Sequence, residues 1–142
     1  MVLYGPGGIG KTTLAATAPG PVAFFDLDDS LPRLRASFSE GGLKLDVRPV
    51  ASASTWQDIR DALHAPGWDE IRTIVIDSAT RAEELAVAHT ITTVPHEKRE
   101  IVIRRIEDYG FGKGYSHVFD TFLTLLGDLE QHTRAGRHVI LI

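Results

Sequence analysis

The sequence predicts an α/β fold, a three-layer sandwich in which helices cover both faces of a mainly parallel β-sheet. Short apolar runs alternate along the 142 residues with segments whose apolar positions repeat at helical spacing. The runs are apolar throughout rather than on every second residue, which is typical of strands buried on both faces. A glycine-rich loop joins the first run to the first helix and marks the candidate site of this framework.

Five apolar runs are predicted to be strands. The first stops at a glycine, the second ends in a group of aspartates and the fourth ends in a single aspartate. Because the sequence closes within the fifth run, we expect residues 1–142 to be one domain, truncated after its fifth strand and lacking further C-terminal strands. The five runs are residues 1–4, 22–25, 45–50, 72–77 and 138–142.

Glycines, prolines and capping residues divide the rest of the chain into six predicted helices. Pro19 and Gly20 end the first helix, and Ser54 or Thr55 is placed to cap the third. The helices are expected at residues 11–18, 30–38, 54–64, 80–93 and 96–108, and from Ser116 to Gly136. A turn is expected at Gly41-Gly42, and a flexible loop at Gly110, Gly112 and Gly114.

The composition excludes several classes of protein. Hydrophobic residues make up 43% and charged residues 24% of the chain, as in ordinary soluble domains. The absence of cysteine excludes disulfides, zinc–thiolate sites and thiol nucleophiles. No apolar run approaches the ~20 residues of a membrane-spanning helix, and no signal-peptide core is present. We therefore expect a cytoplasmic protein.

The glycine-rich loop reads Gly5-Pro6-Gly7-Gly8-Ile9-Gly10-Lys11-Thr12 and is followed by Thr13. It fits the phosphate-binding pattern of Gly, four residues, Gly, Lys and Ser or Thr, between a predicted strand and a predicted helix. Glycines allow backbone N–H groups to surround a phosphate, and the helix adds the positive end of its dipole. We expect Lys11 to contact the β- and γ-phosphates of a nucleotide, Thr12 to ligate Mg²⁺ and Thr13 to contact the α-phosphate. The alternative is a strand-to-helix turn with a chance lysine.

Two aspartates at strand ends complete the predicted site. Asp77 follows the fourth strand, where a carboxylate can hold the metal through water, although Asp77 could instead cap the next helix. Asp26 and Asp28 point to the same face if the second strand stays extended, and Asp28 lies nearer the ligand edge of the sheet. We therefore predict that Asp28 is the base that orients or deprotonates the attacking water. The alternative for Asp28 is a solvated acidic turn.

Several segments together resemble phage and prophage ATP-binding proteins with a RecA-like, AAA-type P-loop NTPase domain. They are the stretch from Tyr4 to Pro21 around the phosphate loop, Val22-Ala23-Phe24-Phe25-Asp26-Leu27-Asp28, Thr73-Ile74-Val75-Ile76-Asp77-Ser78, the 109–115 segment and His138-Val139-Ile140-Leu141-Ile142. The resemblance implies ATP and Mg²⁺ as ligands, Asp77 as the metal carboxylate and Asp28 as the catalytic acid, a position that is usually glutamate in that family. It also implies a sheet in which the Asp77 strand and the Met1 strand flank the His138 strand.

The relatives implied by this resemblance are DNA-dependent ATPases of recombination and single-strand annealing. The chain would then be an ATP hydrolase in bacterial or phage-infected cytoplasm, and its nucleotide would lie between subunits of a homo-oligomer. Two other functions remain open: a small-molecule P-loop kinase, with a lid formed by the segment from Arg99 to Arg105, and a non-hydrolysing nucleotide-dependent scaffold, which the shorter acid at Asp28 allows.

Single-stranded DNA is a candidate partner for the 110–115 segment. Phe111 and Tyr115 offer aromatic rings for bases, and Lys113 offers a cation for phosphates. Glycines such as Gly110 leave these side chains free to adapt. The wider segment, 96–117, also carries Arg104 and Arg105, but its acidic residues nearly cancel the positive charge. The alternative is an exposed helix with charge pairs at helical spacing.

Overall fold

The computed structural model describes residues 1–40, 45–51, 53–98 and 100–142, with no side-chain description for residues 37–40. Its centre is a four-stranded parallel sheet in the order β2-β1-β3-β4. The predicted turn at Gly41-Gly42 and the side chain of Arg99 lie outside the described residues. The strands are β1 (Val22–Asp26), β2 (Val47–Pro49), β3 (Thr73–Asp77) and β4 (His138–Leu141).

Residues 1–4 do not form the predicted strand, but they lie where that strand was expected, beside β4. Residues 1–4 form a single parallel bridge, between Val2 and Leu141, at the edge of β4. The Leu3 N–H donates to Leu141 O (2.8 Å) and the Leu141 N–H donates to Met1 O (3.0 Å), after which the chain leaves the sheet for the glycine-rich loop. The expected neighbours of the His138 strand, the Asp77 strand and the Met1 segment, are confirmed.

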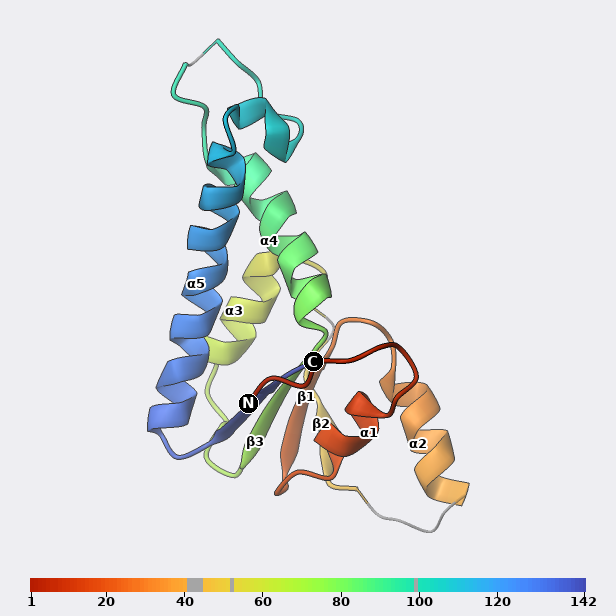
Figure 1. The fold of residues 1–142 in the computed structure, drawn as a ribbon. Helices are drawn as coiled ribbons and strands as arrows, with labels where there is room; N and C mark the ends of the chain where they lie inside the picture. The colour runs from red at the N-terminus through yellow and green to blue at the C-terminus, as the bar shows by residue number, and fades with distance from the viewer. Residues whose placement is uncertain (41–44, 52, 99) are drawn as a thin grey trace.

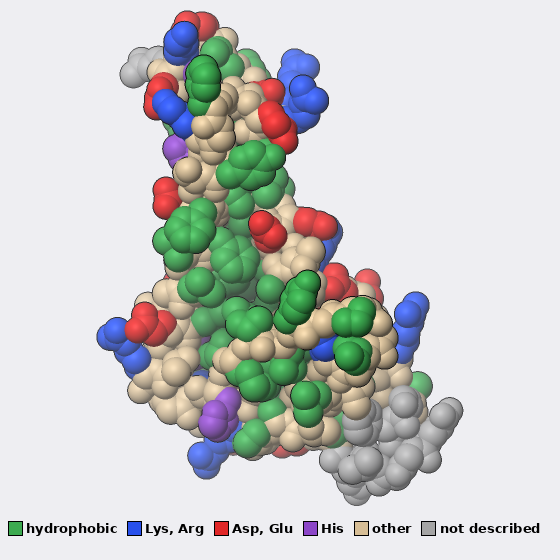
Figure 2. Space-filling model, in the orientation of Figure 1, with side chains coloured by type: hydrophobic (Ala, Val, Ile, Leu, Met, Phe, Trp, Pro, Cys, Tyr) green, Lys and Arg blue, Asp and Glu red, His purple; other side chains and the backbone are tan. Residues whose placement is uncertain are grey.

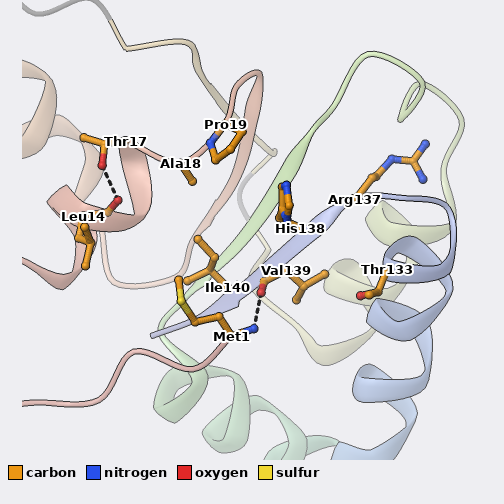
Figure 3. A pocket seen from close by; sticks show the side chains of 10 residues that line it. All are labelled: Met1, Leu14, Thr17, Ala18, Pro19, Thr133, Arg137, His138, Val139 and Ile140. Atoms are coloured by element: carbon orange, nitrogen blue, oxygen red, sulfur yellow. Dashed lines mark hydrogen bonds between the residues drawn. The ribbon is translucent and has the colours of Figure 1, made fainter.

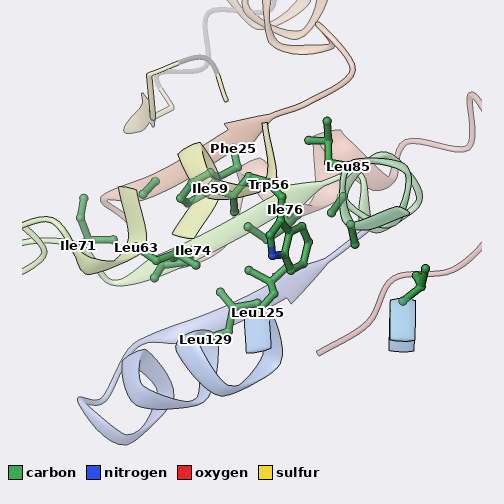
Figure 4. Close-up of a cluster of buried hydrophobic side chains, with 14 of the residues drawn as sticks. Phe25, Trp56, Ile59, Leu63, Ile71, Ile74, Ile76, Leu85, Leu125 and Leu129 are labelled. Atoms are coloured by element: carbon green, nitrogen blue, oxygen red, sulfur yellow. The ribbon is translucent and has the colours of Figure 1, made fainter. Parts of the chain in front are cut away.

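Helices cover both faces of the sheet, which confirms the three-layer arrangement (Figure 1). Alternate strand residues separate the two cores: Phe25 and Ile76 face one, and Phe24 and Val75 face the other. Figure 4 shows the larger core, in which three helices pack on the sheet. These helices are α3 (Trp56–His64), α4 (Ala79–Thr93) and α5 (Lys113–Arg134), and the opposite face carries α1 (Lys11–Ala16) and α2 (Leu31–Glu40).

Capping residues set the starts of two helices. Thr55 caps α3, as one of the two predicted options, because its side chain accepts the Asp58 N–H while Asp58 accepts the Thr55 N–H. Ser78 caps α4 by accepting the N–H of Arg81. Both signals are local in sequence, so these boundaries lie within two residues of the predicted ones.

The predicted helix at 96–108 is wrong. Among the described residues of this segment, only those of the short 3₁₀ turn η1 (Ile106–Tyr109) are helical. The Asp108 carboxylate accepts the N–H groups of Arg104 and Arg105, and Arg105 is the extended N-cap of η1, so a helix cannot run through these two residues. The long helix α5 begins at Lys113, three residues before the predicted start, and Gly112 in a left-handed conformation precedes it.

Helices α4 and α5 run side by side and extend beyond the sheet as a protrusion (Figure 1). The Tyr109 hydroxyl joins its tip to α4, because it lies 3.0 Å from Thr90 O and 2.6 Å from Val94 O. Figure 2 shows hydrophobic side chains gathered along this protrusion, and the exposed ones on α5 are Tyr115, Phe119, Leu123 and Leu126. Among the described residues, no helix has the length and apolar composition needed to cross a membrane.

Gly114 is predicted to tolerate no side chain. The sequence suggested a flexible glycine, but Gly114 is buried in the first turn of α5, and a Cβ there would collide with the carbonyl oxygen of Ile106. Because that neighbour is backbone, it cannot rotate away. We expect Gly114→Ala to lower the free energy of unfolding by about 1–3 kcal/mol, the usual cost of overpacking. Chemical denaturation measures this, with Gly127→Ala as the control, since a Cβ at Gly127 meets no atom within 4 Å.

Candidate functional site

The glycine-rich loop lies at the carboxyl end of the sheet, between the Val2 bridge and α1. Gly8 and Gly10 have φ angles of 77° and 91°, a region that favours glycine. A Cβ at either position would meet no atom within 4 Å, so glycine is needed there for backbone conformation rather than for space. No side chain caps α1, so its first N–H groups remain available to a ligand.

Lys11 closes the loop on itself. Its Nζ donates to the carbonyl oxygens of Gly5 (2.9 Å) and Pro6 (3.0 Å). The ammonium carries three donors, so it can hold the loop and still offer a hydrogen bond to an anion. The cation therefore lies beside the N-terminus of α1, and both features favour negative charge at this point.

Thr12 and Asp77 meet although 65 residues separate them. The Thr12 hydroxyl donates to Asp77 Oδ2 at 2.7 Å. Asp77 is almost completely buried at the end of β3, and the cap of α4 is Ser78, so the Asp77 side chain is directed to the loop instead of capping the helix. A hydroxyl and a carboxylate side by side are hard oxygen ligands of the kind that Mg²⁺ prefers.

Ser30 is a member of this cluster that the sequence analysis missed. Its hydroxyl lies 3.0 Å from Asp77 Oδ2 and 2.9 Å from Asp26 Oδ1. The Asp26 carboxylate also accepts the N–H groups of Ser30 (2.7 Å) and Leu31 (3.0 Å), which fixes the start of α2. The only signal for Ser30 in the sequence is its position between a strand end and a predicted helix.

Asp26 and Asp28 do not share a face of an extended strand as predicted. Strand β1 ends at Asp26 and the chain bends over the next three residues, so strand alternation no longer applies at Asp28. Asp26 is occupied by the start of α2, whereas the Asp28 side chain is exposed and lines a cavity beside the loop. The bend separates the two carboxylates and leaves Asp28 as the one that opens to the cavity.

The cavity beside the loop has a volume of about 450 Å³, within the usual range of ligand pockets. One wall comes from the loop and α1, and the other from the turn after β1 and the first turn of α2. Gly5, Pro6, Gly7 and Ile9 of the predicted loop do not line it, and Ile9 is exposed. The lining residues are Gly8, Gly10, Lys11, Thr12, Thr13, Asp28, Asp29, Ser30, Arg33 and Leu34.

The described residues fit a metal that arrives with its ligand. Within the described ranges, no group of three or more His, Cys, Asp or Glu residues is placed to hold a metal ion. Nucleotide-bound Mg²⁺ needs no such group, because phosphates and waters supply most of its oxygen ligands. The Thr12 hydroxyl and the Asp77 carboxylate fit the protein's share of such a ligand set.

A second cavity, of about 620 Å³, lies at the opposite ends of the strands (Figure 3). Met1, Leu14 and Ile140 line it, and no residue of the 5–13 loop does. The Arg137 Nε beside it donates to Trp68 O at 3.0 Å. The larger cavity thus contains none of the loop glycines, Lys11 or Thr12, which line the smaller one.

At the tip of the protrusion, Lys113 and Tyr115, which the sequence suggested as DNA contacts, are paired with acidic side chains. Lys113 Nζ lies 2.7 Å from Glu97 Oε1, and this ion pair lowers the pKa of Glu97. The Tyr115 hydroxyl donates to Glu107 Oε1 at 3.1 Å, which raises the pKa of Tyr115. Phe111 remains fully exposed, with a φ of 49°. On the face that Figure 2 shows, cationic and acidic side chains are mixed at this tip.

Comparison with protein families gives one match that covers the whole sequence. The model of a family described as an AAA domain matches residues 1–142. The comparison with curated proteins found no match, and neither did the comparison with solved structures. The span of the family match includes the loop, the Asp77 strand and the turn that carries Asp28.

Proposed function

Because the chain belongs to the AAA domain family, it is a nucleotide-binding P-loop NTPase domain, and we propose that it binds ATP with Mg²⁺ and hydrolyses the ATP. The contact between the Thr12 hydroxyl and Asp77 Oδ2, at 2.7 Å, carries this proposal. It joins the end of the phosphate loop to a carboxylate at the edge of the sheet where α/β proteins bind ligands.

Each site residue predicted from the sequence has a proposed task. Lys11 and the loop N–H groups hold the phosphates, and Thr12 and Asp77 hold the metal. When bound, Mg²⁺ neutralises phosphate charge. Asp28 opens to the same cavity and accepts a proton from the attacking water or orients it. Thr13, on the first turn of α1, binds the α-phosphate.

The other two functions have less support. Arg104 and Arg105 directly precede the 3₁₀ turn at the tip of the protrusion, whereas α1 lies against the sheet (Figure 1). A kinase lid from that segment would have to cross this separation. A non-hydrolysing scaffold would use the same nucleotide site, but Asp28 would not activate water. An assay of ATP turnover separates the two functions.

A nucleotide-binding assay with and without Mg²⁺ tests the proposal. We expect ATP to bind more tightly with Mg²⁺, and we expect Asp77→Asn to remove most of that gain, because the amide keeps the shape of the carboxylate but loses its charge. The control is Asp120→Asn, an exposed carboxylate on α5 outside the cavity. Equal Mg²⁺ dependence in wild type and Asp77→Asn would remove Asp77 from the metal site.

We also propose that the ATPase serves phage-type DNA recombination or single-strand annealing, as a homo-oligomer, with the 110–115 segment on single-stranded DNA. The exposed ring of Phe111 supports this, since aromatic rings stack on bases. Single-stranded DNA should then raise the rate of ATP hydrolysis, and Phe111→Ala should reduce that increase. An identical rate with and without DNA, together with no salt-sensitive DNA binding, would disprove the DNA part alone.

A further inference from the structure

Arg33 is a residue of the nucleotide cavity to which no role has been given so far. It lines the wall opposite the loop, together with Asp28, Asp29, Ser30 and Leu34. Among the described residues around this cavity, Lys11 and Arg33 are the two cations, and they lie on opposite walls. A polyanion between the walls would therefore meet a positive charge on each side.

The position of Arg33 on α2 brings it close to the metal ligands. Ser30 directly precedes α2 and Arg33 is the third residue of the helix, so the two residues lie one turn apart at its start. Helical side chains lean toward the N-terminus, which directs Arg33 back toward Ser30. The Ser30 hydroxyl itself lies 3.0 Å from Asp77 Oδ2, the atom that also accepts the Thr12 hydroxyl. Arg33 thus lies beside Ser30, which contacts Asp77, one of the proposed metal ligands.

Local helix energetics do not explain an arginine at this point. Arg33 lies in the first turn of α2, where the helix dipole disfavours a cation, and no acidic residue shares that turn. Its side chain is exposed, and it forms no ion pair with any described carboxylate. A cation that opposes the helix dipole and has no ion pair to compensate is typical of a position kept for function.

We propose that Arg33 contacts the terminal phosphate of a bound nucleoside triphosphate and so selects triphosphate over diphosphate. This inference rests on the proposed nucleotide site. Arginine is suited to the task, because its planar guanidinium donates two parallel hydrogen bonds to phosphate oxygens and remains charged at any physiological pH. In this proposal, the guanidinium belongs to the same chain as the phosphate loop and reaches the nucleotide from the first turn of α2.

The test compares Arg33→Ala with Arg35→Ala, which removes the same charge from the same helix. Arg35 is directed to β2, where its Nη2 donates to Val47 O at 3.4 Å, and it does not line the cavity. Dissociation constants are measured with Mg²⁺ for ADP and for a non-hydrolysable ATP analogue. We expect Arg33→Ala to weaken binding of the analogue about tenfold and to change ADP binding less than twofold. Arg35→Ala should change neither.

Three results would overturn the inference, and each has a distinct meaning. Equal weakening of both nucleotides by Arg33→Ala would place the contact on another part of the ligand. Unchanged affinity for both would show that Arg33 does not touch the ligand. If the wild-type chain binds neither nucleotide, the proposed function fails and the inference fails with it. Arg33→Lys adds a direct check. It keeps the charge but loses the two parallel N–H donors of the guanidinium, so it should restore only part of the affinity for the analogue.

Discussion

Lys11→Ala is expected to weaken nucleotide binding by about 100-fold or more, for ATP and ADP alike. The change removes a cation from the phosphate side of the cavity and also the two hydrogen bonds that hold the loop closed, to Gly5 O and Pro6 O. A hydrogen bond to a charged group contributes roughly 1.5–3 kcal/mol, so the loss of the ammonium's contact with the phosphates, together with a less ordered loop, gives an effect of this size. Calorimetry or a fluorescent nucleotide measures it.

The fold should survive this substitution, because Lys11 contacts only the loop. Lys98→Ala is the matched control, since Lys98 lies on the protrusion away from the cavity. Its affinity and its melting temperature should equal those of the wild type. An unchanged nucleotide affinity in Lys11→Ala would show that the loop is not the phosphate site, whatever the family of the chain.

Asp128→Asn is expected to cause the second large effect, a loss of about 2–3 kcal/mol of stability. Asp128 is a buried carboxylate on α5 that joins two residues of α3. Arg60 Nε lies 2.7 Å from Asp128 Oδ2, and His64 Nε2 lies 2.9 Å from Oδ1. Breaking a buried ion pair usually costs about 3–5 kcal/mol. Water reaches Arg60 and His64 in part, which lowers the expected cost.

Thermal unfolding measures this effect. For a chain of this size, a loss of 2–3 kcal/mol corresponds to a melting temperature lower by roughly 6–10 °C. The control is Asp120→Asn, which removes an exposed carboxylate from the same helix and should leave the melting temperature unchanged within about 1 °C. A similar shift in both variants would mean that α5 responds to net charge and not to the buried pair.

The same cluster predicts how stability depends on pH. Burial by itself raises the pKa of Asp128, but the hydrogen bonds from Arg60 and His64 outweigh it and hold that pKa below its ordinary value. A carboxyl group with a lowered pKa stabilises the fold above its unfolded value of about 3.9, and this contribution is lost as the pH falls through the folded value. The stability difference between wild type and Asp128→Asn should therefore shrink below about pH 4.

His132 acts in the same direction at a higher pH. Its burial lowers its pKa, since the folded protein favours the neutral ring, whose Nε2 donates to Leu63 O at 3.0 Å. The unfolded chain takes up the proton first as the pH falls below about 6.5, so stability declines from that point. Wild-type protein should thus lose stability in two acid steps, and the lower step should be smaller in Asp128→Asn. It should not vanish, because Asp58, Glu97 and Asp108 also have lowered pKa values.

The features that depend on neighbours in sequence could be predicted. The phosphate loop follows from the spacing of Gly5, Gly10 and Lys11, the cap of α3 from Thr55 and the strand end from Asp77. The helix at 96–108 could not be excluded in this way, because its residues have acceptable helix propensity. Asp108 instead binds the backbone of Arg104 and Arg105, and this competing contact forms a short turn.

The sequence by itself determined the α/β class, the order of the strands and helices apart from the 1–4 strand and the 96–108 helix, and the position of the glycine-rich loop, because local spacing encodes all three. Only the tertiary structure decided which side chains face one another. It placed Ser30 against Asp77, Arg33 in the wall opposite Lys11, and Asp128 against Arg60, which is 68 residues away. Such pairs form when parallel strands and their helices come together, and no periodicity along the chain records them.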